Sequence, residues 1–230
     1  MKTLIIISHP EIKESSSQQY LLHSIPDTDT ITIHHLEEIY SDSPIDVRKE
    51  QELLAAHDRI IFQFPFYWYS SPALLKQWQD DVLTDGFAHG KKGNQLKNKE
   101  FALVLLVGAA KSDYQAGGKE RYNIDELTKP FQAMAHKTGM TYLKTFAIHQ
   151  FAYMTEEEKM TLLIDYQQFL TNDTELSLFS REKWLLNQLE KTNIASLGTG
   201  NEEKLRHVIE LIKENRETID DLKLSLDDMN

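Results

Sequence analysis

A segment near the N-terminus has residues that could bind a phosphate group. His9 is followed by three consecutive serines, Ser15, Ser16 and Ser17, and then by Gln18, where a short apolar run gives way to helical periodicity. The free N–H groups and positive end of a helix N-terminus, together with serine hydroxyls, suit a phosphate monoester. His9 could donate a further hydrogen bond. Because serine is also a preferred N-cap residue, the alternative is that the serines only cap the helix.

A cluster of aromatic residues forms a second candidate segment. Four aromatics in succession lie between two prolines, directly after another apolar run. Such a cluster offers stacking surface, and a loop stiffened by proline offers backbone N–H groups to the edge of a planar heterocycle. For Phe66 and Tyr69, a hydrophobic plug or subunit contact is a competing interpretation. The residues of the segment are Pro65, Phe66, Tyr67, Trp68, Tyr69 and Pro72.

A third segment combines small residues with a phenol. Val107, Gly108, Ala109 and Ala110 follow an apolar run and allow close backbone approach to a ligand, and Tyr114 could bring its hydroxyl to the reacting face. A flexible surface loop is the alternative for the glycines farther on.

Other chemistries find little support. No G-x-G-x-x-G or Walker-type loop occurs, and the chain has no cysteine, so redox chemistry requires a bound cofactor. His34 and His35 are adjacent and cannot share a helical face, and no H-E-x-x-H spacing occurs. We therefore expect no metal centre, and we interpret His136 and His149 as structural.

The elements that position these segments alternate along the chain. Short, uniformly apolar runs predict strands at residues 3–7, 30–34, 59–64, 101–107 and 142–148. Helical periodicity predicts helices at residues 16–24, 46–57, 72–83, 124–137 and 156–170. The alternation predicts an α/β three-layer sandwich around a five-stranded parallel sheet. Since ligands bind beyond the carboxyl ends of parallel strands, the three segments should meet there.

Composition separates the end of the chain from this domain. After residue 170 two amphipathic patterns, at residues 181–191 and 202–224, predict a helical appendage over 171–230, with a break at Gly198 to Gly200. The net charge of −11 argues against nucleic acid and anionic membrane surfaces as partners. The first apolar run is too short for a signal sequence or a membrane span. We expect a cytoplasmic protein.

Three motifs together resemble the NAD(P)H dehydrogenase (quinone) family, which includes ancillary subunits of glutathione-gated potassium efflux systems. They are the His9-Pro10 pair with the serines behind it, the aromatic block at residues 65–70 and the Pro72-to-Trp78 run. Over about residues 1–170, the resemblance implies a flavodoxin-like fold with strand order 2-1-3-4-5, a homodimer, and FMN or alternatively FAD. It places His9 and residues 15–18 at the flavin phosphate, residues 66–69 and 107–110 around the ring, and Tyr114 over it.

The chain also departs from this family. Val107-Gly108-Ala109 stands where the family usually has Thr-Gly-Gly, and the histidine expected shortly after Tyr114 is absent, with Lys119 or Glu120 in its neighbourhood. The resemblance implies a two-step exchange in which NAD(P)H reduces the flavin and a quinone-like acceptor then takes the electrons. The alternatives are a regulatory subunit of a transport system, motivated by the acidic tail, and a one-electron flavodoxin.

Overall fold

The computed structural model describes residues 1–26, 28–172, 177–191 and 199–227. The chain divides into two compact units, Met1–Thr171 and Asn172–Asn230, which are described separately. Within the described residues, no helix is both long enough and apolar enough to cross a membrane.

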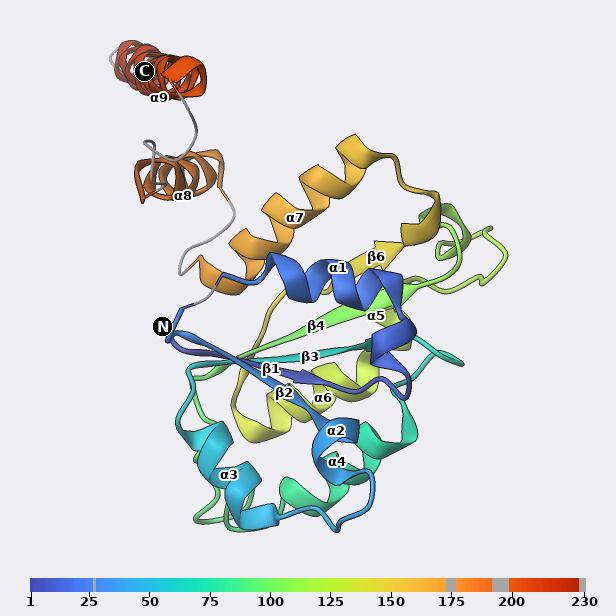
Figure 1. Ribbon diagram of the computed structural model, residues 1–230. Coiled ribbons are helices and arrows are strands. Elements are labelled where there is room, and N and C mark those ends of the chain that lie inside the picture. The colour runs from blue at the N-terminus through green and yellow to red at the C-terminus, as the bar shows by residue number, and fades with distance from the viewer. Residues whose placement is uncertain (27, 173–176, 192–198, 228–230) are drawn as a thin grey trace. The chain divides into compact units, whose positions relative to one another are not determined.

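A parallel sheet forms the centre of the first unit (Figure 1). Its order is β2-β1-β3-β4-β5, as the resemblance implies, and β6 pairs with the same strand as β5, which is β4. Neighbouring strands are parallel throughout, so the predicted α/β architecture is confirmed. The strands are β1 Thr3–Ile7, β2 Ile31–His35, β3 Arg59–Pro65, β4 Glu100–Val107, β5 Thr141–Tyr142 and β6 Phe146–His149.

The predicted fifth strand is divided in two. Tyr142 pairs with Phe101, and Phe146 pairs with Val104. The chain therefore advances four residues from Tyr142 to Phe146 while β4 advances three. One extra residue of this kind is a bulge, which interrupts the ladder and bends an edge strand. Apolar content alone does not reveal such an insertion, and the prediction of one continuous strand over residues 142–148 was therefore wrong.

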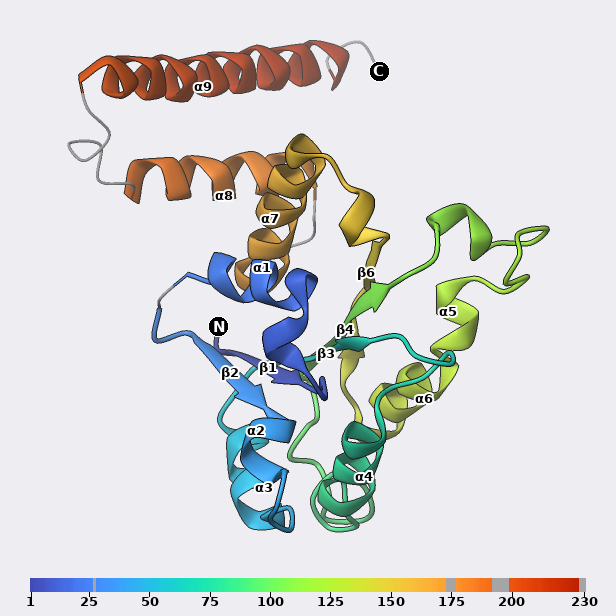
Figure 2. The same ribbon diagram turned by 45° about the vertical axis from the view of Figure 1, so that its right-hand side comes forward.

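Helices cover both faces of the sheet (Figure 2). Alternate strand residues face opposite sides: Ile5 and Ile7 pack with α1 and α7, whereas Leu4 and Ile6 pack with α2, α3, α4 and α6. This alternation gives the three predicted layers. The helices are α1 Ser16–Ser24, α2 Leu36–Tyr40, α3 Val47–Ala55, α4 Ala73–Val82, α5 Ile124–Leu127, α6 Lys129–Thr138 and α7 Glu156–Thr171.

Two helical predictions need correction. The helix expected over residues 124–137 is interrupted at Thr128, because Pro130 cannot donate a backbone hydrogen bond and favours a new helix start. The short helix α2 directly follows β2 and was not predicted, since its five residues are too few to show a helical period.

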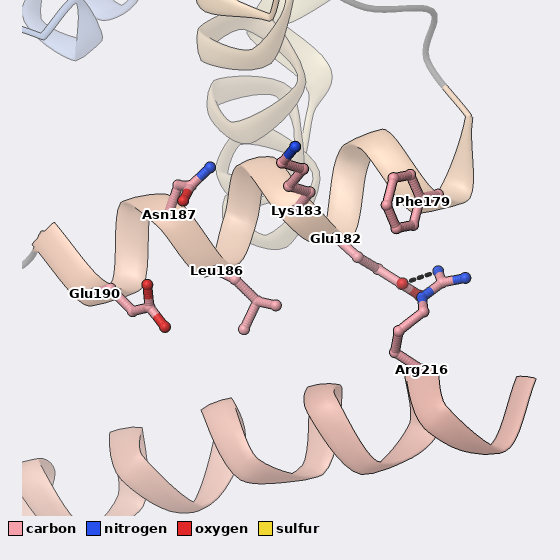
Figure 3. Close-up of a pocket in the computed structure, with 7 residues that line it drawn as sticks. All are labelled: Phe179, Glu182, Lys183, Leu186, Asn187, Glu190 and Arg216. Atoms are coloured by element: carbon pink, nitrogen blue, oxygen red, sulfur yellow. Dashed lines mark hydrogen bonds and ion pairs between the residues drawn. The ribbon is translucent and has the colours of Figure 1, made fainter. Parts of the chain in front are cut away.

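The second unit is a pair of helices, α8 Leu178–Lys191 and α9 Thr199–Asp227, so the predicted helical appendage is confirmed. Of the predicted break, Gly198 lies outside the described residues, and α9 begins at Thr199. Arg216 of α9 forms an ion pair with Glu182 of α8 and lies 5.2 Å from the centre of the Phe179 ring. Figure 3 shows these side chains beside a hollow of about 220 Å³ between the two helices. The hollow therefore lies between two helices that are joined by this ion pair.

Candidate functional site

A pocket of about 290 Å³ lies at the carboxyl edge of the sheet. It brings together parts of all three segments singled out in the sequence, together with one further segment. The residues that line it are His9, Ser15, Ser16, Ser17, Pro65, Tyr67, Leu106, Val107, Gly108, Ile148, Gln150, Phe151, Ala152 and Tyr153. The expectation that the three loops meet beyond the strand ends therefore agrees with this geometry.

The first wall is the start of α1. Ser15 is the N-cap residue and its hydroxyl accepts a hydrogen bond from the Gln18 N–H at 3.4 Å. The Ser15 and Ser17 hydroxyls are 3.3 Å apart, and Ser16 is exposed. Capping thus uses one serine and leaves the others facing the pocket, so the capping interpretation accounts for only part of the triplet.

The Gln18 side chain does not line this pocket. It is fully buried, and its Oε1 accepts a hydrogen bond from Gln63 at 2.6 Å. The Gln63 Oε1 in turn accepts one from the Tyr166 hydroxyl at 2.6 Å. Gln18 therefore takes part in a core network beside the site, and only its backbone belongs to the phosphate loop.

His9 is oriented by its own loop. Its Nδ1 accepts a hydrogen bond from the Glu11 N–H at 3.1 Å, so in the neutral ring the proton resides on Nε2. Burial lowers the pKa of His9 despite the opposing charge of Glu37. Neutral His9 can therefore donate from Nε2 to a bound oxygen.

The second wall is a strained turn. Trp68 and Tyr69 have φ values of 47° and 64°, in the left-handed region that side chains other than glycine seldom adopt. The turn is closed by the Ser70 N–H, which donates to the Tyr67 carbonyl at 3.0 Å. Strained backbone conformations cluster at binding and catalytic sites, so this turn is a candidate for one.

The aromatic residues of this turn have different surroundings. Pro65 and Tyr67 line the pocket, whereas Phe66 is buried against Tyr114 with ring centres 6.4 Å apart. Trp68 is 91% exposed, and neither it nor Tyr69 lines the pocket.

The third wall begins at the end of β4. Val107 and Gly108 line the pocket, and a Cβ added at Gly108 would meet no atom within 4 Å. Ala109 and Ala110 lie just beyond the lining residues. The Ala109 carbonyl accepts a hydrogen bond from the Nδ1 of His149 at 3.1 Å.

Tyr114 lies between two rings near this wall. It packs against Phe66 and against His149, whose ring centre is 5.8 Å away. Burial, followed by the charges of Glu120 and Asp113, raises its pKa, so the phenol is protonated at neutral pH. It is not among the residues lining the 290 Å³ pocket.

The two residues considered as replacements for the missing histidine pair with groups other than the Tyr114 hydroxyl. The Lys119 side chain is exposed, and its Nζ lies 4.0 Å from the Oδ1 of Asp113. The Glu120 carboxylate accepts a hydrogen bond from the Tyr69 hydroxyl at 2.6 Å. The histidine beside Tyr114 is His149, which comes from β6 rather than from the residues following Tyr114. The position of His149 beside Tyr114 could not be predicted, because proximity between two strands leaves no local signal in the sequence.

A fourth wall was not predicted. Gln150 has a left-handed backbone with φ of 50°, and its N–H donates to the Val107 carbonyl at 2.8 Å. The 3-10 helix η3, Phe151–Tyr153, then borders the pocket, and Tyr153 is 81% exposed. Aromatic residues directly after a strand are the same signal that marked the second segment, so this wall could have been found.

Gly108 offers a direct test of the pocket as a ligand site. Replacing it with alanine and then leucine is expected to weaken flavin binding progressively, about tenfold or more for leucine, by filling space that a ligand would occupy. The melting temperature of the ligand-free alanine variant should stay within about 2 °C, since the new Cβ meets no atom within 4 Å. Fluorescence titration with FMN and thermal denaturation measure the two effects. Unchanged FMN affinity in Gly108→Leu would place the ligand elsewhere.

Comparison with known families identifies the first unit. Residues 1–170 match the family model described as having a flavodoxin-like fold. The chain belongs to this family. An uncharacterized NAD(P)H oxidoreductase of Bacillus subtilis, YdeQ, is 46% identical over 194 residues, covering 84% of this chain and 98% of the relative.

Two solved structures extend the comparison. An NADPH-quinone reductase from P. pentosaceus is 44% identical, with a TM-score of 0.71 over 76% of this chain and all of that chain. The general stress protein 14 of Treponema denticola, solved in complex with FMN, is 37% identical, with a TM-score of 0.70 over 74% of this chain and 98% of that chain.

The donor set of the pocket fits a flavin. Serine hydroxyls and the α1 N-terminus match a phosphate monoester, and Tyr67, Gly108 and the strand ends provide flat, closely approachable surface for a ring. In the described part of the chain, no group of three or more His, Asp or Glu side chains could hold a metal ion.

Proposed function

We propose that the chain is a flavin-dependent oxidoreductase that binds FMN and transfers electrons from NAD(P)H to a quinone-like acceptor. The observation that carries the proposal is a pocket in which groups suited to a phosphate and surfaces suited to a planar ring meet. The names of the relatives, an NAD(P)H oxidoreductase and an NADPH-quinone reductase, support the reaction class. The FMN complex of the Treponema protein supports FMN over FAD.

Three of the walls have a task in this proposal. Ser15, Ser16, Ser17 and the Nε2 of His9 would hold the phosphate, and Pro65, Tyr67, Val107 and Gly108, which line the pocket, would position the ring. Bound flavin supplies hydride acceptance from NAD(P)H and two-electron reduction of the acceptor. The protein orients these partners and excludes water, which strengthens the hydrogen bonds made to them.

Tyr114 would donate a hydrogen bond to the acceptor oxygen. Its phenol is protonated at neutral pH, and no described side chain hydrogen-bonds to it. His149 would support this role, because it holds the Ala109 carbonyl and packs against the phenol ring.

Replacing Tyr114 with phenylalanine is expected to reduce quinone turnover about 100-fold, the loss typical of a positioned proton donor. FMN affinity should change less than about twofold, since the ring packing against Phe66 is kept. Tyr122→Phe is the control, because Tyr122 is an exposed tyrosine on the same loop. Stopped-flow measurement of the oxidative half-reaction checks the effect, and equal turnover in both variants would remove Tyr114 from the mechanism.

The experiment that tests the whole proposal begins with the visible spectrum of the purified protein. Releasing the cofactor and measuring its mass separates FMN from FAD, and assays of NADH and NADPH oxidation with a quinone establish the reaction. A colourless protein that binds neither added FMN nor added FAD would contradict the proposal.

Other predictions concern assembly and location. The homodimer, the transport-protein partner and the cytoplasmic location stay predictions. Light scattering of the purified protein tests the first, and co-purification from cells tests the second. Quinone turnover in the absence of any partner would favour the enzyme over the regulatory alternative.

A further inference from the structure

A carboxylate on α2 holds the loop that precedes α1. The Oε1 of Glu37 accepts a hydrogen bond from the Ser8 hydroxyl at 2.6 Å, and its Oε2 accepts one from the His9 N–H at 2.9 Å. The Nε2 of His35 lies 3.3 Å from the same Oε2 and donates to the His9 carbonyl at 3.1 Å. Both backbone polar groups of His9 are therefore held from outside its own loop.

This pair does not line the pocket. His9 and the serines line the 290 Å³ pocket, whereas His35 and Glu37 border a separate hollow of about 280 Å³ together with residues 10–14. The side chains are only 11% and 18% exposed. Neither would touch a bound phosphate, so any effect on it must act through loop geometry and charge.

The negative charge of Glu37 is unfavourable for binding an anion at the loop that it holds. A half-buried carboxylate behind a phosphate loop repels the phosphate, unless a nearby cation compensates it. The groups that face His35 are Glu37, Glu38 at 3.7 Å from its Nδ1, and His9. Glu11, Lys13 and Glu14 border the same hollow, so the surroundings are mainly acidic.

The protonation of both partners follows from these contacts. Burial opposes ionisation of Glu37, but hydrogen bonds from His35, Ser8 and His9 outweigh it and lower its pKa. Burial also opposes protonation of His35, but its hydrogen bonds to Glu37 and His9 and the charges of Glu37 and Glu38 outweigh it and raise its pKa. The contacts therefore favour the anionic form of Glu37, and His35 keeps its positive charge to a higher pH than an ordinary histidine.

We propose that Glu37 and His35 are a positioning pair that fixes the phosphate loop and, while His35 is protonated, cancels the negative charge behind it. The inference rests on the proposed flavin function and adds a pH dependence to phosphate recognition. Since the Nε2 of His35 faces two acceptors, it keeps its proton when the ring becomes neutral. The proton is then lost from Nδ1. This removes the positive charge of His35 but keeps the hydrogen bonds of Nε2 that fix the loop.

The test compares FMN with riboflavin, which has the same ring system and no phosphate. Dissociation constants are measured by fluorescence quenching from pH 7 to pH 9, a range in which the FMN phosphate is already largely dianionic because its second pKa is about 6. For the wild-type chain, FMN affinity should fall about three- to tenfold as His35 loses its charge, whereas riboflavin affinity should stay constant.

Variants assign the titrating group. His35→Gln keeps a hydrogen-bond donor without the charge, so its FMN affinity at pH 7 should equal that of the wild type at pH 9 and should change little with pH. His23→Gln is the matched control, because this exposed histidine of α1 donates from Nδ1 to the Gln19 carbonyl and lies outside the His35–Glu37 pair, and it should keep the wild-type slope. Melting temperatures of all variants establish that they are folded.

The outcomes are distinct. A wild-type slope that persists in His35→Gln, or that disappears only in His9→Gln, overturns the positioning pair and leaves flavin binding intact. An equal slope for riboflavin also overturns it, because the effect would then not involve phosphate. If the wild-type chain binds neither flavin, the proposed function itself fails.

Discussion

Replacing Glu50 with alanine is expected to lower the free energy of unfolding by about 3–5 kcal/mol, because it leaves three buried polar groups without their acceptor. Glu50 lies on α3 and is fully buried. Its carboxylate accepts hydrogen bonds from the Tyr40 hydroxyl at 2.5 Å and the Trp78 indole at 2.9 Å, and the His34 Nε2 lies 2.9 Å away. Urea denaturation at pH 7 measures the loss.

The matched control is Glu52→Ala on the same helix. Glu52 is exposed and pairs only with Arg48 one turn away, so the expected change is within about 0.5 kcal/mol. Equal stability of the two variants would show that the buried carboxylate contributes nothing beyond a surface charge.

The same carboxylate predicts a pH dependence. Burial opposes the ionisation of Glu50, but hydrogen bonds from His34, Tyr40 and Trp78 outweigh it and lower its pKa below the ordinary value of 4.5. A lowered pKa in the folded state gives stability that is present above 4.5 and lost as pH falls through the lowered value. The stability difference between the wild type and Glu50→Gln should therefore shrink on acidification below pH 4.5.

The sheet and three of the four walls could be predicted because their signals are local. Uniformly apolar runs mark strands buried on both faces, and loops after such strands must meet at one edge. The order of the strands came from the family resemblance, since alternation alone permits several orders.

Other features could not be predicted, because they depend on contacts between elements that are far apart in the chain. The carboxylate of Glu50 contacts side chains on β2, α2 and α4. The residues around position 50 do not distinguish Glu50 from the solvent-exposed acidic residues nearby in the sequence. Trp78 is fully buried, and its hydrogen bond to Glu50 could not be predicted from the residues around either position. The role of Glu37 could not be predicted for the same reason. Its helix, α2, is also too short to show a helical period.

Gln18 shows a different limit of local reasoning. Its position after three serines favoured a role in binding, but its side chain turns into the core rather than toward the pocket. Its side chain is therefore buried with Gln63, while the serines before it face the pocket. Proximity along the chain did not decide which way the side chain points.

Placing a negative charge at the start of α1 is expected to have opposite effects on the helix and on its ligand. Ser16→Asp puts a carboxylate at the first position of the helix, where the positive end of the helix dipole favours it, so the melting temperature of the ligand-free protein should stay the same or rise. FMN affinity should fall about 100-fold, because the carboxylate would lie beside a phosphate dianion. Titration with FMN and thermal denaturation of the ligand-free protein measure the two effects.

Two comparisons separate charge from shape. Ser16→Asn has nearly the same shape as the aspartate without its charge, and it should retain FMN affinity within about threefold. Riboflavin should bind all three proteins almost equally, since it presents no phosphate to the helix. A loss of riboflavin binding that matches the loss of FMN would mean that residue 16 faces the ring, and the phosphate would then have to bind elsewhere. Retained FMN affinity in Ser16→Asp would reduce the three serines to a helix cap, which is the alternative that residue types alone could not exclude.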